Sequence, residues 1–396
     1  MRIGIVSPTV IFNEFVQYFN ENDKKYLSQL YQNENGPAPT IIAQGFISEG
    51  HFVRFFTLGP ETRICKSPVI DIVTIDVMSG IRKYVRLNEF KNAYFMAKEM
   101  TPFVDDLDVL HAQWSYYTAM AAGRFAKKMP VFCTVRDWTS VIRSFLPGKG
   151  GIQWEIRQLI NDINFRNKNI HFIGNSPYTK SLIEQRIGKE VPCIMNPIND
   201  SVLRKDEKIY PDCLNMVCIA SSVDARKNIG NLLLAYKIIK EEMPTALLTC
   251  VFGYAKTLDE NPYYKRWKSE GLLDGVRELK GLSHKEVFDC IDESTMMVNP
   301  SLEETFGNTI IESMSRKTPV IAGRDSGAIP YLIGNNEKGY LCDVTSVNDI
   351  AKTVIYAYNN IEETKKKAKV AFEWVLNSNT LGAITKAHID YYKSFL

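Results

Sequence analysis

Two glutamates and a glycine lie close together in the second half of the chain. Residues 299–327 read NPSLEETFGNTIIESMSRKTPVIAGRDSG, and seven residues separate Glu304 from Glu312. Gly307, between them, removes side-chain bulk where a helix must begin. The first N–H groups of a helix lack internal partners and carry partial positive charge, so they bind anions. The expected donors are the main-chain N–H groups of Phe306, Gly307, Asn308 and Thr309.

The two carboxylates stand on either side of this predicted anion site. Carboxylates accept hydrogen bonds, and the vicinal hydroxyl groups of a sugar donate them. The arrangement therefore predicts a ligand with phosphate in the middle and a polyol at each end, as in a nucleotide-sugar. The alternative, which the residues leave open, is a capped helix with two surface glutamates.

A second group of candidates is the segment SVDARKN at residues 222–228. It follows the apolar run Met216–Ser221 and precedes the helical pattern Ile229–Glu242. The helix dipole disfavours cations at a helix start, so Arg226 and Lys227 suggest a phosphate that compensates for them. A solvated helix start is the alternative.

Short apolar runs that alternate with helical patterns must position these residues. Such alternation predicts a doubly wound α/β sheet. Strands are expected at residues 2–7, 51–58, 69–77, 108–113, 131–135, 171–174, 192–195, 216–221, 247–253, 275–281, 295–298, 319–322 and 339–343. At 396 residues the chain suits two domains, and the polar segment 196–213 is the best boundary.

Composition excludes several classes of protein. A net charge of +3 is too small to indicate nucleic-acid binding. The pI near 8.3 allows loose contact with anionic lipid. No apolar run is long enough to span a bilayer, and the N-terminal sequence goes straight into a strand without a signal pattern. The eight scattered cysteines are typical of a reducing compartment, so we expect a cytoplasmic location, which includes the inner face of the membrane.

Two segments of the first half invite a specific interpretation. Tyr26–Ile47 contains Pro37 and Pro39, which predict an irregular, acceptor-facing loop without a regular helix; a surface insertion without function is the alternative. Arg82–Met100 is a helix candidate rich in basic and aromatic residues, which suits either contact with a membrane or an ordinary amphipathic helix. Asp106–Asp108 matches a DxD metal motif but precedes a strand, so we expect a solvated turn and no metal site.

The segment from Glu304 to Glu312, followed by SMSRKTPVIA, resembles the E-x7-E region of retaining glycosyltransferases of the GT-B fold, specifically family four. Lys227-Asn228 also match this family, whose usual arginine falls here on Ser222, with Arg226 as a possible substitute. The resemblance implies two doubly wound, Rossmann-like domains that face each other across a cleft. It implies an acceptor-binding domain at residues 1–198, completed by a C-terminal helix at about 380–396, and a nucleotide-sugar-binding domain at 199–379.

The resemblance also implies roles for individual residues. Glu312 is expected to hold the ribose hydroxyls of the donor, and Glu304 the sugar hydroxyls. Lys227, with Arg226, is expected to stabilise the departing diphosphate of a UDP- or GDP-linked sugar, without metal or other cofactor. Ser222 is expected at the donor.

Three residues of the first half resemble the family less closely. His111 resembles a histidine at a strand end near the sugar, although a packing role is equally open. Arg136 stands where the family usually has a histidine, and Asp137 is kept. An arginine at that position suits a phosphate or an acidic sugar, or a pair with Asp137.

The expected function is transfer of a sugar, with retained configuration, from a nucleotide-sugar to a glycan or lipid-linked acceptor in the synthesis of surface polysaccharides or glycoconjugates. A nucleotide-sugar epimerase of the same fold is one alternative. A non-catalytic partner subunit that binds sugar nucleotides is the other.

Overall fold

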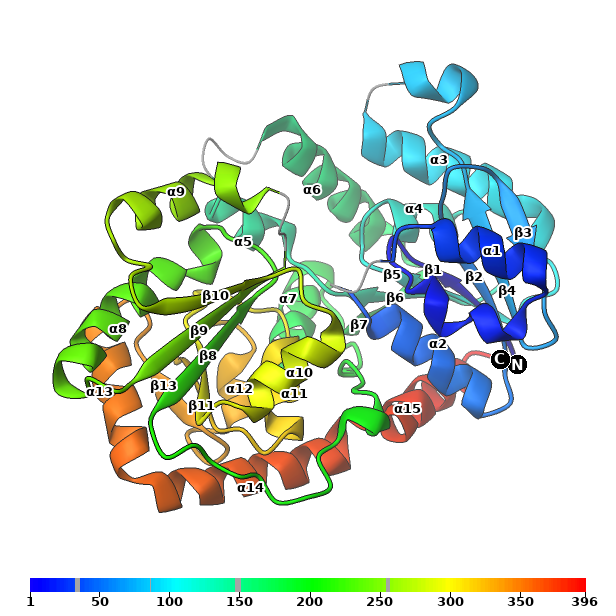
Figure 1. Cartoon of the computed structure of the whole chain (residues 1–396). Helices are drawn as coiled ribbons and strands as arrows, with labels where there is room; N and C mark the ends of the chain where they lie inside the picture. The colour runs from blue at the N-terminus through cyan, green and yellow to red at the C-terminus, as the bar shows by residue number, and fades with distance from the viewer. Residues whose placement is uncertain (33–35, 86, 147–150, 254–256) are drawn as a thin grey trace. The chain divides into compact units, whose positions relative to one another are not determined.

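The computed structural model describes residues 1–32, 36–85, 87–146, 151–253 and 257–396 (Figure 1). The chain divides into two compact units, Met1–Pro197 with Leu381–Leu396, and Ile198–Thr380. Both divisions fall one residue from the bounds expected from the sequence. Each unit is described by itself.

The first unit is built on a seven-stranded sheet with the order β3-β4-β2-β1-β5-β6-β7. Its strands are β1 (Arg2–Val6), β2 (Phe52–Leu58), β3 (Arg63–Cys65), β4 (Ile70–Ile75), β5 (Val109–Gln113), β6 (Val131–Val135) and β7 (Ile170–Gly174). The short edge strand β3 pairs antiparallel with β4, whereas the other neighbours are parallel. The sequences of the central strands are mostly apolar, because helices cover both faces of the sheet and side chains on both faces are buried.

Most helices of the first unit lie between strands of its sheet, whereas α7 follows the last strand and α15 comes from the C-terminal end of the chain. They are α1 (Glu21–Gln29), α2 (Ala38–Ser48), α3 (Asn88–Met100), α4 (Tyr117–Gly123), α5 (Thr139–Ser144), α6 (Gly151–Arg166), α7 (Pro177–Ile187) and α15 (Leu381–Lys393), with short 3-10 turns η1 (Phe12–Glu14), η2 (Val16–Tyr18), η3 (Gly80–Tyr84) and η4 (Thr101–Phe103). The C-terminal helix α15 packs against α2, where the hydroxyl of Thr385 lies close to Gly45, and its Ile384, Ile389 and Tyr392 enter the core of this unit.

The second unit has a fully parallel six-stranded sheet with the order β10-β9-β8-β11-β12-β13. Its strands are β8 (Asn215–Ala220), β9 (Leu247–Phe252), β10 (Val276–Lys280), β11 (Met296–Asn299), β12 (Val320–Gly323) and β13 (Tyr340–Cys342). Its helices are α8 (Ile229–Glu242), α9 (Pro262–Ser269), α10 (His284–Asp292), α11 (Asn308–Ser315), α12 (Ile329–Ile333), α13 (Val347–Asn359) and α14 (Ile361–Ser378), with 3-10 turns η6 (Asp200–Val202), η7 (Ala225–Lys227) and η8 (Leu258–Glu260).

Both units therefore have the expected α/β class, with helices that alternate with parallel strands in each. Among the described residues, a large cluster of buried apolar side chains packs in the second unit, and two such clusters pack on the sheet of the first. Among the described residues, no helix is long and apolar enough to cross a membrane.

The interpretation of Tyr26–Ile47 as an irregular loop was wrong in part. Residues Ala38–Ser48 form α2, with Pro37 at its N-cap and Pro39 in its first turn. Proline is tolerated there because the first N–H groups of a helix have no internal partner to lose. Residues 33–35, in the same segment, lie outside the described residues.

The predicted helix Arg82–Met100 was also wrong in part. The chain forms the short turn η3 first, and α3 begins only at Asn88, after Leu87 in a left-handed conformation (φ 47°). Residues 192–195, expected as a strand, make only an isolated bridge between Cys193 and Gly174, whereas the short edge strand β3 was missed.

Asp106 and Asp108 lie in a turn, as expected. Asp106 forms ion pairs with Arg2 and Arg54, at 2.7 and 2.5 Å, and Asp108 accepts a hydrogen bond from the main-chain N–H of Arg2. Both carboxylates therefore have partners within the protein.

Candidate active site

The strand order of the second unit locates its ligand crevice. From β8 the chain moves outward to β9 and β10 and then returns to β11 on the other side of β8. Connections that leave neighbouring strands in opposite directions open a crevice at the carboxyl ends of those strands. The two loops at this point are residues 221–228, after β8, and residues 300–307, after β11. Six of the twelve candidate residues lie in these loops: Ser222, Arg226, Lys227, Glu304, Phe306 and Gly307.

Main-chain and amide hydrogen bonds hold the two loops together. The N–H of Leu302 donates to the carbonyl of Arg226 at 2.8 Å. The side-chain amide of Asn228 donates to the carbonyls of Pro300 and Val344, at 3.1 and 2.8 Å. Asn228 also adopts a left-handed conformation (φ 50°), which ends the turn η7 and starts α8. These hydrogen bonds join the loop after β8 to the loop after β11.

Lys227 and Glu304 face each other across these loops. Their Nζ and Oε1 atoms lie 2.5 Å apart, and only 11% and 13% of the two side chains are exposed. Burial by itself would raise the pKa of Glu304, but the charges of Lys227 and Arg226, together with hydrogen bonds from Lys227 and Ser301, outweigh it and lower that pKa. Glu304 therefore keeps its negative charge at neutral pH.

Arg226 lies next to this pair and contacts a third carboxylate. Its guanidinium is 3.4 Å from Glu303, whose side chain is almost completely buried. Sequence reasoning missed Glu303, because an acidic residue directly before Glu304 has no separate signal. Arg226 and Lys227 thus each pair with one glutamate of the loop that leads into α11.

Gly307 gives α11 its start. It has a φ of 96°, and a Cβ atom there would meet side-chain methyls of Ile329 and Leu332 at 3.2 and 3.3 Å. Only glycine suits both conditions. The predicted main-chain donors, Phe306 to Thr309, form the turn into this helix and its first residues. The helix begins where the sequence predicted.

Glu312 lies in the second turn of α11, with 14% of its side chain exposed. Its Oε1 is 3.0 Å from Nε2 of His284, the first residue of α10. Sequence reasoning missed this histidine. A signal existed, because Ser283 and Glu286 form a capping box that places His284 at a helix start directly after β10.

Ser222 lies in the loop after β8. Its hydroxyl donates to Asp224 at 2.8 Å, and Asp224 in turn caps the N–H of Lys227. Ser222 therefore shapes the loop after β8.

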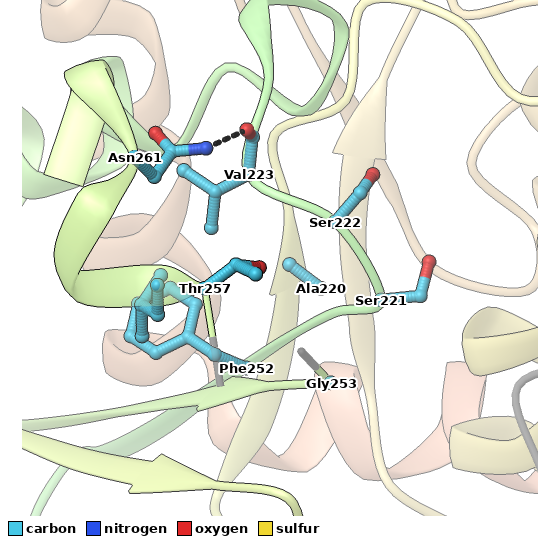
Figure 2. A pocket seen from close by; sticks show the side chains of 9 residues that line it. Ala220, Ser221, Ser222, Val223, Phe252, Gly253, Thr257 and Asn261 are labelled. Atoms are coloured by element: carbon cyan, nitrogen blue, oxygen red, sulfur yellow. Dashed lines mark hydrogen bonds between the residues drawn. The ribbon is translucent and has the colours of Figure 1, made fainter. Parts of the chain in front are cut away.

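Ser222 also lines a pocket at the carboxyl ends of β8 and β9 (Figure 2). The pocket is lined by Ala220, Ser221, Ser222, Val223, Phe252, Gly253, Thr257, Leu258 and Asn261. The amide of Asn261 donates to the carbonyl of Val223 at 2.8 Å and fixes one wall.

The three candidates of the first half lie in the first unit. His111 is fully buried in β5, and its ring contacts the hydroxyls of Thr134 and Tyr392 at 2.8 and 2.6 Å. This geometry fits the packing role that the sequence left open. It does not fit contact with a sugar, because no part of the side chain reaches the surface.

Arg136 and Asp137 follow β6. Arg136 is 6% exposed and donates hydrogen bonds to the side-chain oxygens of Gln113 and Asn196. Burial lowers its pKa to about 10. Asp137 accepts a hydrogen bond from the indole N–H of Trp114 at 2.8 Å. Arg136 is thus part of a buried polar network, with Asp137 as a nearby charge.

The second unit is similar in sequence to known glycosyltransferases. The sequence model described as "Glycosyl transferases group 1" matches residues 203–374. A trehalose synthase of Pyrococcus horikoshii is 28% identical over 179 residues, which cover 44% of this chain and 42% of that relative. The chain thus matches less than half of the length of such relatives.

Solved structures extend the similarity of fold to the whole chain. Sucrose-phosphate synthase from Thermosynechococcus elongatus has a TM-score of 0.75 at 16% identity, and the match covers 100% of this chain and 98% of that one. Anabaena Alr3699/HepE, solved in complex with UDP-glucose, has a TM-score of 0.69 at 12% identity, with complete coverage of both chains. The second unit thus matches the sequence model of the group 1 glycosyltransferases, and the chain as a whole has the GT-B fold of these solved structures.

Proposed function

We propose that this protein transfers a glycosyl unit from a UDP- or GDP-linked sugar to a glycan or lipid-linked acceptor, with retained anomeric configuration and without a metal ion. The observation that carries the proposal is the Lys227–Glu304 pair, held at 2.5 Å beside Gly307 at the start of α11. Cations, a carboxylate and a helix N-terminus meet there at the carboxyl ends of β8 and β11.

The chemistry follows from where charge develops. When the bond between the sugar and the diphosphate breaks, negative charge grows on the departing phosphate. Lys227 and Arg226 supply fixed positive charge, and the first N–H groups of α11 supply oriented donors, so little reorganisation is needed during the reaction. The departing phosphate takes the acceptor's proton on the same face of the sugar, which gives retention without a dedicated protein base.

The two glutamates orient the donor. Glu304, beside Lys227, accepts hydrogen bonds from sugar hydroxyls near C3 and C4, and Glu312 accepts them from the ribose. Because Glu304 is ionised despite its burial, it remains an acceptor at neutral pH. The first unit binds the acceptor. A separate surface of the same unit makes the expected contact with an anionic membrane.

The substitution Lys227→Ala tests the proposal. Loss of one donor to a developing anion costs roughly a hundredfold or more in turnover. Lys237→Ala, which removes an exposed lysine from the following helix α8, is the matched control and should leave turnover unchanged. Transfer to an acceptor is measured with UDP- and GDP-linked sugars, and binding of UDP and GDP is measured separately. Equal turnover in wild type and Lys227→Ala would refute the role of Lys227.

Product analysis separates this function from its two alternatives. A glycosyltransferase forms a glycosylated acceptor and free nucleotide. An altered nucleotide-sugar formed without any acceptor would instead identify an epimerase. Tight binding of a nucleotide-sugar, with neither transfer nor hydrolysis over a panel of acceptors, would identify a non-catalytic binding subunit.

A further inference from the structure

The segment between β4 and α3 exposes apolar side chains where the predicted helix does not form. Met78, Ile81, Tyr84, Val85 and Leu87 are all exposed, and Ile81 and Tyr84 are 76% and 73% exposed. In Figure 1 this segment is the light-blue coil that extends beyond the N-terminal turn of α3. We refer to these five side chains as the apolar tip. Contiguous exposed apolar side chains are costly in water and mark interaction surfaces.

Specific hydrogen bonds hold the base of the apolar tip. The carboxylate of Asp76 accepts from the N–H groups of Met78 and Ser79, at 2.7 and 3.0 Å. Arg82 donates to the main-chain carbonyl of Asp76 and to the carboxylate of Glu99. These hydrogen bonds hold the conformation of the turn that carries the apolar tip.

The charge of the segment has one sign. Residues 77–88 contain the basic residues Arg82, Lys83 and Arg86 and no acidic residue. The charge of Arg82 is balanced by Glu99, whereas Lys83 is exposed and its Nζ lies 4.9 Å from the centre of the Tyr84 ring. Arg86 lies outside the described residues and is counted from the sequence alone.

These features together match the interfacial region of an anionic bilayer. Tyrosine places its ring among acyl chains and its hydroxyl among headgroups, lysine extends its ammonium toward phosphate, and aliphatic side chains enter the hydrocarbon. A short turn that carries apolar and basic residues without an acidic one suits this environment, since an acidic side chain would be repelled by the lipid.

We propose that the apolar tip docks the first unit on an anionic lipid bilayer, with Ile81 and Tyr84 inserted and Lys83 on lipid phosphates. This inference deepens the proposed function, because it places the first unit where a lipid-linked acceptor is held. In that respect it rests on the proposed function, although the docking itself needs neither donor nor acceptor.

Flotation with lipid vesicles tests the docking. One set of vesicles contains phosphatidylcholine alone, and the other contains phosphatidylcholine mixed with phosphatidylglycerol. Wild-type protein should bind the anionic vesicles. The double substitution Ile81→Ser/Tyr84→Ser should weaken that binding by at least about tenfold, because two apolar side chains no longer leave water. Lys83→Glu should weaken binding to the anionic vesicles and leave any binding to the neutral ones unchanged.

Ile209→Ser is the matched control, since Ile209 is an equally exposed isoleucine (83%) in the second unit. This variant should bind vesicles as wild type does. Thermal unfolding and binding of UDP or GDP should be the same for all variants, which shows that they are folded and that the donor site is intact.

Three outcomes would overturn the docking proposal: wild type that does not bind anionic vesicles, an unaffected double variant, or an Ile209→Ser variant that loses as much binding. None of these outcomes tests the proposed donor chemistry, because vesicle binding is measured without any nucleotide-sugar. Conversely, failure of the Lys227→Ala test would leave the vesicle result standing.

Discussion

The loops of the second unit and those of the first use the same residue types in different ways. In the second unit, Lys227 and Glu304 form a pair at the edge of a crevice, where each side chain keeps some exposed surface. In the first unit, His111 lies in β5 and Arg136 directly follows the neighbouring strand β6, but their polar atoms bind buried partners. Burial, rather than residue type, separates candidates for ligand binding from residues that hold the fold.

The largest effect on stability is expected at Arg136. The substitution Arg136→Met keeps most of the volume but leaves buried oxygens of Gln113 and Asn196 without this donor, at a cost of about 3 kcal/mol. Arg166→Met, at an exposed position of α6, is the control and should change stability by no more than about 0.5 kcal/mol. Urea unfolding followed by circular dichroism measures both. A loss at Arg136 no larger than at Arg166 would argue for a ligand-binding role of Arg136.

A somewhat smaller effect is expected at Gly307. Gly307→Ala forces a Cβ atom into a left-handed backbone and against Ile329 and Leu332, which costs about 1–3 kcal/mol and distorts the start of α11. Gly50→Ala is the comparison, because Gly50 has a similar positive φ of 75° and open space around it. We expect only the Gly307 variant to lose nucleotide binding in a thermal-shift assay. An equal loss of nucleotide binding in both variants would contradict an anion site at the start of α11.

His284 in the second unit and His111 in the first extend the comparison of the two units to a single residue type. His284→Ala should raise KM for the donor about tenfold, equivalent to about 1.4 kcal/mol, with little change in kcat or stability, because His284 orients Glu312. His111→Ala should do the reverse and lower stability without a change in donor KM. Steady-state kinetics and thermal unfolding of both variants decide the matter, and a normal donor KM for His284→Ala would contradict the positioning role.

The smallest expected effect is the pH dependence of the Lys227–Glu304 pair. Because the folded pKa of Glu304 lies below its ordinary value of 4.5, the pair stabilises the protein above that pH, and this contribution is lost as pH falls through the lowered pKa. The stability difference between wild type and Glu304→Gln should therefore be larger at neutral pH than in acid. Urea unfolding at a series of pH values measures it, and a difference that grows in acid would mean that Glu304 is not stabilised as a carboxylate.

The sequence by itself determined most of the elements and the central part of the site. Runs such as Val131–Val135 are almost entirely apolar, and such runs form buried parallel strands wherever helices cover both faces. The order of strand, Gly307 and helix predicts the positions of Glu304 and Glu312 relative to the start of α11. This prediction needs only residues that are close in sequence.

Only the tertiary structure decided the rest. The contacts of Glu304 with Lys227 and of Glu312 with His284 join residues far apart in sequence, and strand order, which local patterns do not encode, brings them together. The break before α3 was missed because the pattern of Arg82–Met100 suits a helix throughout. The place of His111 at a strand end left contact with a ligand and a packing role equally open, and only the packing of Tyr392 from the far end of the chain showed it to be buried.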